Sequence, residues 1–396
     1  MSDTLSLASE HPLSNMGRWW RYAGFAIVAT AGFFYINIMS AIVDGLVVGL
    51  HFDNAQAGLV GSANIYGASV GALLAVLIVR HVRWRPTLFA LLIILLAIDL
   101  ASMLVSAPLA LAAIRAVHGL VGGTIVGVTY SAMARLPVPQ RAFGMLLFVQ
   151  FGLGGLGVMF LPKLVPFYGV TVLFLTLAAL TLAALLILLT LREQSVTDAV
   201  GATRANLGRA QWRSALFLLL ALFLFQGGNM GLTAFIVRLG EHYGLTREFI
   251  SDTLGWATWI GASGAVLVMV LDDRFGAWKP TVLAALTTLL GCALFLRSDS
   301  PAAFFLGNAL GALAWSFVVP YLFGFISRLD ASGHLAALGG LASKLGLASG
   351  PLAAGFLLHH DDRYVTLIVL SLIAIGAAMA AAFIGIHRVR TAGPSS

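Results

Sequence analysis

The sequence contains a single cysteine, Cys292. One thiol cannot form an intrachain disulfide and cannot build a metal site from cysteine ligands. The chain also lacks a phosphate-binding GxxxxGKS or GxxxxGKT loop and an HExxH motif, so no motif predicts ATP hydrolysis or zinc-dependent catalysis. We therefore expect no cofactor, no metal and no enzymatic activity.

Charged residues are scarce as well. They make up 10% of the 396 residues, whereas apolar residues make up 60%. Soluble domains contain about 25% charged and about 45–50% apolar residues, so the composition excludes an ordinary soluble domain. The formal charge of +7 comes from basic residues in short clusters between apolar stretches. Such clusters indicate membrane topology, so we expect a lipid bilayer and no nucleic acid as partner.

A block of residues recurs 194 positions along the chain. The first copy begins with Tyr66-Gly67-Ala68-Ser69 and the second with Ile260-Gly261-Ala262-Ser263. The period is close to half of the chain, which predicts two copies of one membrane unit. Parallel repeats related by an axis along the membrane normal are typical of transporters that bind their substrate between the halves.

The apolar stretches predict an all-α membrane protein with twelve transmembrane helices in two pseudo-symmetric six-helix bundles. About 20 helical residues cross a hydrocarbon core of about 30 Å. The polar stretch 192–213 predicts a linker between an N-terminal half, 1–191, and a C-terminal half, 214–396. Four spans begin at or near a proline, which suits the first turn of a helix. The expected spans are 22–50, 57–79, 86–105, 108–134, 142–163, 169–191, 214–239, 251–271, 280–296, 301–327, 335–358 and 364–387.

Lysine and arginine set the expected orientation. If the N-terminus is cytoplasmic, that side receives 16 of the 23 basic residues and the opposite side receives 5. Arg115 and Lys344 are the two that remain within the spans. This bias follows the positive-inside rule. We expect a multi-pass protein of the plasma (inner) membrane with both termini cytoplasmic, acting as a monomer.

Short motifs lie at matching places in the two halves. Asp273-Arg274-Phe275-Gly276 follows the eighth span, and Val79-Arg80-His81-Val82-Arg83 ends the second span. The fourth span carries Arg115-Ala116-Val117-His118-Gly119, and the eleventh carries Gly346-Leu347-Ala348-Ser349-Gly350-Pro351. With these motifs the chain resembles the major facilitator superfamily over nearly its whole length. The related family patterns are the loop G-x-x-x-D-R-x-G-R, which lacks its acid and glycine in the first half, and the R-x-x-Q-G motif of helix 4, here with His118 for glutamine. The glycine-proline motif of antiporters is the third, found here in the eleventh span and normally in the fifth.

The resemblance implies a gating role for the cytoplasmic loops. Basic residues there can pair with acids or with helix C-terminal carbonyls and close the inner side in one state. The alternative for the first loop is simple anchoring by its arginines. The implied gating residues are Arg80, Arg83, Asp273, Arg274 and Gly276.

Four charged residues, Asp44, Asp99, Arg115 and Lys344, lie deep in the predicted spans. A charge near the bilayer centre costs about 2.5–3.5 kcal/mol, so each needs a partner or a task. Asp44, Asp99 and Arg115 lie at similar depth, about 10 Å below the outer surface. We expect a neutralised cluster in which Arg115 serves one or both carboxylates. The cluster either pins helices or couples protons through Asp44 or Asp99, and His118 is either a packing residue or a proton carrier.

Lys344 lies about 14 Å into its span, at the bilayer midplane. No acidic residue of the second half lies at comparable depth, and the symmetry-related residue is Gln150. We therefore expect Lys344 in a water-filled cavity as a substrate or coupling residue. The alternative is a cross-half ion pair with Asp44 or Asp99.

Amide and aromatic residues at similar depth complete the expected binding site. Amide side chains inside the bilayer need hydrogen-bond partners. Gln226 and Asn229 are three residues apart and share one helix face. The expected substrate-binding residues are Lys344, Gln150, Gln226, Asn229, Asn37, Tyr66, Trp259 and Trp315.

Together these features favour a secondary active transporter of a small organic solute that is anionic or bears a carboxylate. Buried acids and a buried base favour protons as the coupling ion, with alternating access of the two halves. The alternative is a drug:proton antiporter that exports lipophilic compounds, which the acid in the first span favours. A membrane-embedded enzyme or receptor is a third class, but the spans contain no cluster of nucleophile, base or metal ligands.

Overall fold

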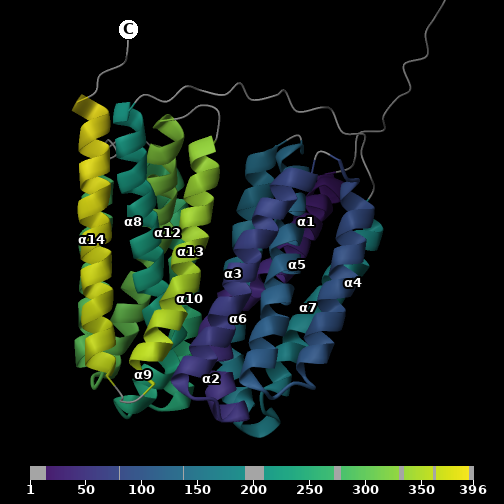
Figure 1. The fold of residues 1–396 in the computed structure, drawn as a ribbon, viewed down its shortest axis with the longest axis horizontal. Helices are drawn as coiled ribbons and strands as arrows, with labels where there is room; N and C mark the ends of the chain where they lie inside the picture. Colours follow the sequence, from purple (N-terminus) through teal and green to yellow (C-terminus); the bar gives the residue numbers. More distant parts are fainter. Residues whose placement is uncertain are drawn as a thin grey trace, which may run out of the picture.

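The computed structural model describes residues 15–79, 81–136, 138–191, 209–271, 278–329, 334–359 and 363–391. Within these ranges the regular structure is entirely helical (Figure 1). This confirms the all-α fold class.

The described part of the first half contains seven helices. A single span was predicted over 22–50, but the structure divides it into two helices that meet at an angle of 53°. The break is at Ile38, whose side chain packs against Gly157 with no room for a Cβ atom there. The helices are α1 (Asn15–Asn37), α2 (Met39–Leu50), α3 (Asn54–Ile78), α4 (Trp84–Ser102), α5 (Pro108–Ala134), α6 (Pro139–Tyr168) and α7 (Thr171–Thr190).

The second half is built in the same way. The span predicted over 214–239 is also interrupted, at Phe235. The helices are α8 (Arg209–Ala234), α9 (Ile236–His242), α10 (Arg247–Leu271), α11 (Trp278–Leu294), the 3-10 turn η2 (Phe295–Arg297), α12 (Pro301–Leu329), α13 (His334–Leu357) and α14 (Tyr364–Thr391).

In the described part of the chain, eight helices are long and apolar enough to cross a membrane, or nine if the bent α1–α2 pair is one span. The number twelve therefore stays a prediction. The predicted linker lies mostly outside the described residues, and α8 already begins at Arg209 within it. The division at 192–213 stays a prediction as well.

Local sequence explains several helix starts. Pro108 and Pro301 begin α5 and α12, as predicted, because proline suits the first helical turn. Asp53 caps α3, where its carboxylate accepts from Gln56 N at 2.8 Å and Gln56 Oε1 accepts from Asp53 N at 3.2 Å. This reciprocal pair satisfies two backbone donors that a helix start leaves free.

Close glycine packing reproduces the sequence repeat in space. A Cβ atom on Gly67 of α3 would lie 2.0 Å from the Ala116 carbonyl oxygen of α5. At the repeat-related position, a Cβ atom on Gly261 of α10 would lie 3.0 Å from Ala312 of α12. Helix pairs in a membrane gain stability by such close backbone approach, so the repeated glycines fix equivalent pairs in each half.

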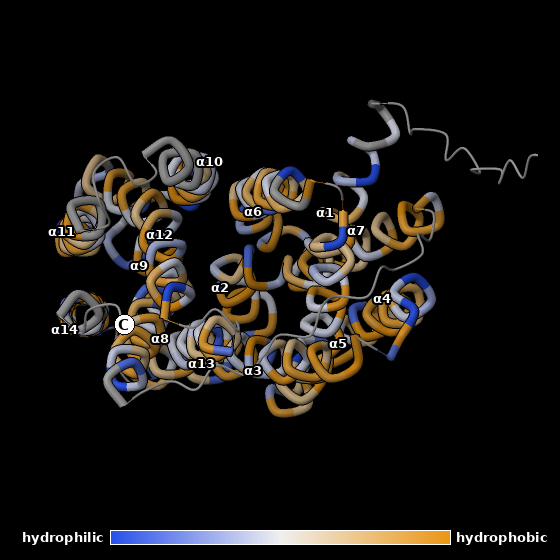
Figure 2. Tube along the Cα trace, turned by 90° about the horizontal axis from the view of Figure 1, so that it is seen from above, coloured by the Kyte–Doolittle hydropathy of each residue, from blue (hydrophilic) through white to orange (hydrophobic). Residues whose placement is uncertain are grey.

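The helices form two groups, α1–α7 and α8–α14, which meet along two seams (Figure 2). At one seam α3 packs against α13, and at the other α6 packs against α10. Exchanging the two halves converts one seam into the other, as expected for a duplicated unit.

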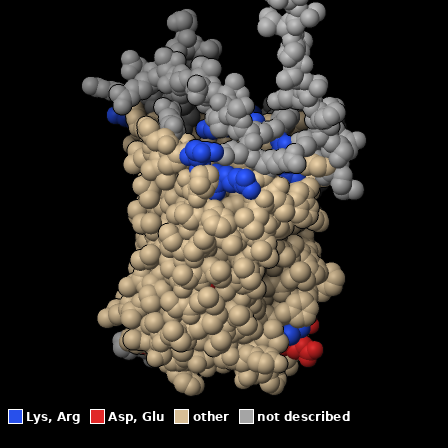
Figure 3. All heavy atoms as spheres, turned by 90° about the vertical axis from the view of Figure 1, so that its right-hand side faces the viewer, with Lys and Arg blue, Asp and Glu red and all other residues tan. Residues whose placement is uncertain are grey.

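The molecule has two ends, which we name by the chain segments found there. The terminal end carries the C-terminus, and the distal end carries α9 and the α2–α3 connection (Figure 1). On the face drawn in Figure 3, Lys and Arg gather near the terminal end and a small mixed group of charges lies near the distal end. The broad band between them contains other residues, as expected for a surface in contact with lipid.

Candidate functional site

A cavity of about 270 Å³ lies between the two helix groups. The first half contributes α1 and α6, and the second contributes residues from α8 to α14. Pockets for drug-sized ligands usually have about 300–1,000 Å³, so this cavity suits a smaller solute.

Four amide side chains line the cavity: Asn37, Gln150, Asn229 and Asn308. Asn229 Nδ2 donates to Phe225 O and Asn308 Nδ2 donates to Phe304 O, each at 2.8 Å. Each of these amide groups is thereby oriented by its own helix. Their Oδ1 atoms have no hydrogen-bond partner among the described residues, so they can accept from a solute.

Asn37 and Gln150 form the matching polar wall in the first half. Asn37 Nδ2 donates to the Gln150 carbonyl at 3.5 Å and joins α1 to α6. Gln150 Nε2 is buried and forms no hydrogen bond of normal geometry with a described residue, and the Tyr130 hydroxyl is a polar neighbour of this side chain. A buried donor without a partner is costly, so this amide favours a solute acceptor in the cavity.

Trp315 provides the main amphipathic surface of the second half. Its Nε1 donates to Gln226 Oε1 at 2.7 Å, and Gln226 Nε2 donates to Ser343 Oγ at 2.8 Å. This polar chain joins α12, α8 and α13. Gln226 is buried behind Trp315 and does not line the cavity, although the sequence predicts it as a binding residue.

Among the described residues that line the cavity, none is charged. Lys344 lies on α13 and is half-buried, one turn from the lining residue Leu347. It makes no hydrogen bond or ion pair with any other described residue. The predicted alternative, a cross-half pair with Asp44 or Asp99, is therefore absent from this structure.

Tyr66 and Trp259 lie at the seams between the halves and not in the cavity wall. Tyr66 Oη lies 2.9 Å from Ser349 Oγ, across the α3–α13 seam. Trp259 Nε1 lies 3.4 Å from the Gly152 carbonyl, to which it donates across the α6–α10 seam. Both positions place these aromatic residues in contacts that must change when the halves move.

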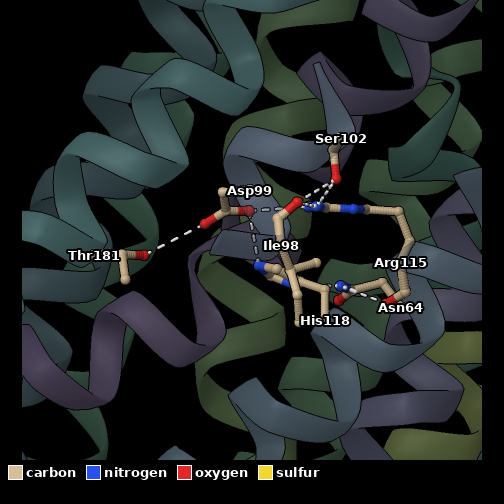
Figure 4. Close-up of polar contacts among 7 residues, drawn as sticks. All are labelled: Asn64, Ile98, Asp99, Ser102, Arg115, His118 and Thr181. Carbon is tan, nitrogen blue, oxygen red and sulfur yellow. Dashed lines mark hydrogen bonds and ion pairs between the residues drawn. The ribbon is translucent and has the colours of Figure 1, made fainter. Parts of the chain in front are cut away.

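A second polar site lies within the first half (Figure 4). Asp99 Oδ1 is 3.1 Å from Arg115 Nη1, and both side chains are fully buried. Arg115 also donates to the Ile98 carbonyl at 3.2 Å and to Ser102 Oγ. Arg115 thus neutralises Asp99, as predicted for one of the two carboxylates.

His118 joins this cluster from α5. Its Nε2 lies 3.1 Å from Asp99 Oδ1, and Asn64 Nδ2 lies 2.7 Å from its Nδ1. Because an amide nitrogen only donates, His118 Nδ1 accepts and its proton lies on Nε2, toward Asp99. Although Nε2 is this close to Asp99, it forms no hydrogen bond of normal geometry with a described residue, so the packing and the proton-carrier roles of His118 both stay predictions.

Asp44 differs from the sequence-based expectation. It does not join Arg115 but pairs with Arg247 of the second half, at 2.5 Å and 3.3 Å for the two nitrogen–oxygen pairs. The Asp44 side chain is fully buried, and that of Arg247 is 20% exposed. Arg247 Nη1 also donates to the Pro162 carbonyl at 3.1 Å, and Nη2 pairs with Glu241.

Further polar contacts join the halves at the distal end. Asn54 Nδ2 donates to the Leu358 carbonyl at 3.0 Å, and Lys163 Nζ lies 2.5 Å from Asp252 Oδ1. With the Asp44–Arg247 pair, these contacts hold the distal end closed. The two helix groups also lie closest together there (Figure 1).

Most of the predicted gating residues lie outside the described part of the chain: Arg80, Asp273, Arg274 and Gly276. Arg83 is exposed and occupies the N-cap position of α4. Next to it, Arg85 Nη2 donates to the Leu189 carbonyl at the end of α7, at 2.9 Å. Pairing of a basic side chain with helix C-terminal carbonyls is the type of contact expected at this end.

Sequence reasoning missed Arg247, Ser343 and Asn308. Asn308 carried a usable signal, since an amide in an apolar span needs a partner or a role. Arg247 carried none, because its partner lies 203 positions away in the other half. Ser343 is a small polar residue, and the sequence does not distinguish it from other serines in the spans.

Solved structures of similar fold are transporters. The nucleoside transporter NupG superposes with a TM-score of 0.71 at 15% identity, covering 93% of this chain and 98% of that one. The peptide transporter POT in complex with sulfate gives 0.72 at 12% identity, covering 96% of each chain. A D-xylose–proton symporter gives 0.69 at 12% identity, covering 92% and 97%. At these identities the likeness shows the fold alone.

Comparison with curated protein sequences finds no match. A sequence profile described as the Major Facilitator Superfamily matches residues 24–343. That range includes the repeat, the α6–α10 seam and most of the cavity wall. The chain therefore belongs to the Major Facilitator Superfamily of membrane transporters.

Proposed function

We propose that this transporter carries a small organic solute with an uncharged polar body and a carboxylate, coupled to protons by alternating access. The observation that carries the proposal is Lys344, a half-buried ammonium that has no counter-charge among the described residues and lies one turn from the cavity wall. A cation at this depth needs an anion or water, because an unpaired charge in the membrane is costly. A solute carboxylate would supply the missing charge.

The cavity wall supports the uncharged body of that solute. Amide oxygens at Asn229 and Asn308 accept hydrogen bonds, and Gln150 Nε2 offers a donor. Trp315, Phe151 and Phe295 supply aromatic surface to the same wall. Such a wall binds a planar or partly apolar metabolite by hydrogen bonding and packing and leaves the charge selection to Lys344.

Flux into proteoliposomes tests the substrate class. A panel of labelled monocarboxylates, nucleosides, pentoses and dipeptides, with and without a pH gradient, includes the solute types named for the similar structures. We expect carboxylates to be transported by the unmodified protein and by Lys344→Arg, and transport to be lost in Lys344→Gln. Equal carboxylate flux in Lys344→Gln would contradict the anionic part of the proposal and leave the transporter assignment intact.

A second candidate is a drug:proton antiporter for lipophilic compounds, favoured by the absence of charge among the described lining residues. Efflux of a cationic dye from proteoliposomes distinguishes the two functions. Dye efflux that persists in Lys344→Gln, without carboxylate flux in either protein, would support the exporter. Carboxylate flux that depends on Lys344 would exclude it.

We further propose that the protein lies in the plasma (inner) membrane with its terminal end on the cytoplasmic side. We also propose that it acts as a monomer and without a cofactor. The 16-to-5 distribution of basic residues supports this orientation. A fluorescent protein fused to the C-terminus should fluoresce, and a periplasmic phosphatase fused there should be inactive. The reverse pattern would overturn the orientation. In this orientation Arg80, Arg83, Asp273, Arg274 and Gly276 would act in closing the cytoplasmic side.

A further inference from the structure

Two buried carboxylates could exchange the proton, and their surroundings differ in one decisive respect. Asp99 contacts Arg115, His118 and Thr181, all in the first half. When the halves move relative to each other as bodies, these partners move together with Asp99. Alternating access therefore leaves the environment of Asp99 nearly unchanged, and a proton bound there would not sense the state of the transporter.

Asp44 is placed differently. Its partner Arg247 belongs to the second half and holds both carboxylate oxygens. The other charged groups that face Asp44 are Glu241 and Arg238, which lie on α9 of the second half and pair with each other at 3.0 Å. Within the part of the chain that the structure describes, every charged group that faces Asp44 thus lies in the opposite half. Opening of the distal end would separate Asp44 from all of them.

Separation of the two halves would leave Asp44 and Arg247 in different surroundings. Arg247 keeps Glu241, which lies in its own half and already contacts its Nη2 atom. Asp44 keeps no cation among the described residues, and α2 offers it no charged neighbour, since Ser40 is the one other polar residue of that helix. A carboxylate without a counter-charge binds a proton more readily than the same carboxylate in a bidentate arginine pair. Opening of the distal end would therefore increase the proton affinity of Asp44, whereas Arg247 would keep an acidic partner.

We propose that Asp44 is the carboxylate that links proton binding to opening of the distal end, with Arg247 as the partner that displaces the proton on closure. This assignment rests on the proposed proton coupling. A proton on Asp44 removes the negative charge that holds Arg247, so it favours the open distal end. Release of the proton restores the pair and favours the closed end. Since binding and opening are linked, each shifts the other by the same factor.

A distance measurement tests the link without any solute. Spin labels at Tyr168→Cys and Asp299→Cys, exposed positions at the distal ends of the two halves, report opening in nanodiscs. Cys292 is buried, and the parent chain treated with label serves as background. We expect acidic pH to lengthen the distance in the unmodified protein. In Asp44→Asn we expect the long distance at every pH, with no remaining pH dependence.

The control is a second cross-half ion pair. Asp252→Asn removes the partner of Lys163, but both of these side chains are partly exposed and keep access to water. This variant should retain the pH dependence. If Asp44→Asn does not fold, Arg247→Gln breaks the same pair from the other half and should also favour the long distance.

Two results would contradict the proposed role of Asp44. A normal pH response in folded Asp44→Asn or Arg247→Gln, with the Asp99 cluster intact, would transfer the coupling to another group. Loss of the response in Asp252→Asn would show that any cross-half pair has the same effect. Carboxylate flux is measured separately, so a failed substrate assignment with an intact distance response leaves the role of Asp44 standing.

Discussion

At the scale of single residues, buried charges divide into one that is fixed and one that depends on the arrangement of the halves. Asp99 and Arg115 form a closed pair inside one helix group, where Arg115 also lies 5.0 Å from the centre of the Phe174 ring. Such a pair is expensive to break from one side, because the remaining charge stays buried. The Asp99–Arg115 pair therefore holds α4 and α5 together.

Replacing Asp99 by Asn should destabilise the protein by about 3–5 kcal/mol, because Arg115 is left without a counter-charge. Thermal unfolding in detergent, followed by tryptophan fluorescence, measures the loss. Asp252→Asn is the matched control, because its ion pair is partly exposed and should be worth about 0–1 kcal/mol. Equal effects of the two substitutions would contradict the pinning role.

Gln226 and Asn229 share a helix face but have different partners, and this difference is testable. Gln226→Leu leaves Trp315 Nε1 and Ser343 Oγ without their partner, which should cost about 1–3 kcal/mol. Asn229→Leu removes only a bond to its own helix, so the loss of stability should be much smaller. The midpoint of thermal unfolding distinguishes the variants. A larger loss in Asn229→Leu would show that the polar chain behind Trp315 contributes little.

At the scale of helices, glycine sets how closely α3 and α5 approach. A Cβ atom on Gly119 would lie 1.8 Å from the Asn64 carbonyl oxygen, which leaves no space for alanine without a shift of the backbone. Gly67 and Gly123 show the same close approach from the two sides of this pair. The helices therefore meet backbone to backbone.

Gly119→Ala should lower stability by about 1–3 kcal/mol through overpacking of α3 against α5. Gly376→Ala is the control, since a Cβ atom there has nothing within 4 Å on α14. Alanine in an open helix position should be neutral or stabilising by up to about 1 kcal/mol. Thermal unfolding of both variants measures the contrast, and a stable Gly119→Ala would show that the α3–α5 distance can relax.

At the scale of the whole molecule, the two seams decide which end is open. At the α3–α13 seam a Cβ atom on Gly58 would lie 2.4 Å from the Pro351 carbonyl oxygen. Gly355 approaches Asn54 O equally closely, at 2.5 Å. The α3–α13 seam thus has no space for a Cβ atom at Gly58 or Gly355. A larger side chain at either position would push α3 and α13 apart.

Gly58→Val should therefore shift the protein toward an open distal end. Labelling of Asp53→Cys with a membrane-impermeant maleimide, added from the distal side, should become faster in this variant. Gly144→Ala is a control away from the seam, because nothing lies within 4 Å of its Cβ position. Unchanged labelling in Gly58→Val would show that the seam does not control access.

The sequence was sufficient for the fold class, the family and several cavity residues. Repeated glycines and apolar spans have local signals, and Asn37, Gln150, Asn229 and Trp315 were recognisable as polar or amphipathic groups in apolar helices. The Asp44–Arg247 pair could not be predicted from the sequence. Counting residues from the end of a span gives the depth of a residue in the membrane but does not show which helices face each other. Gln226 was misplaced for the same reason, since one helix face includes both lining and supporting positions.

The break at Ile38 has a structural consequence. Asn37 contacts the cavity just before the break, and Asp44 holds the distal latch about two helical turns beyond it. The two helices meet there at 53°, so one interrupted span connects the cavity wall with the distal ion pair. Cavity and ion pair thus lie in sequence on the same span, with Asn37 on one side of Ile38 and Asp44 on the other.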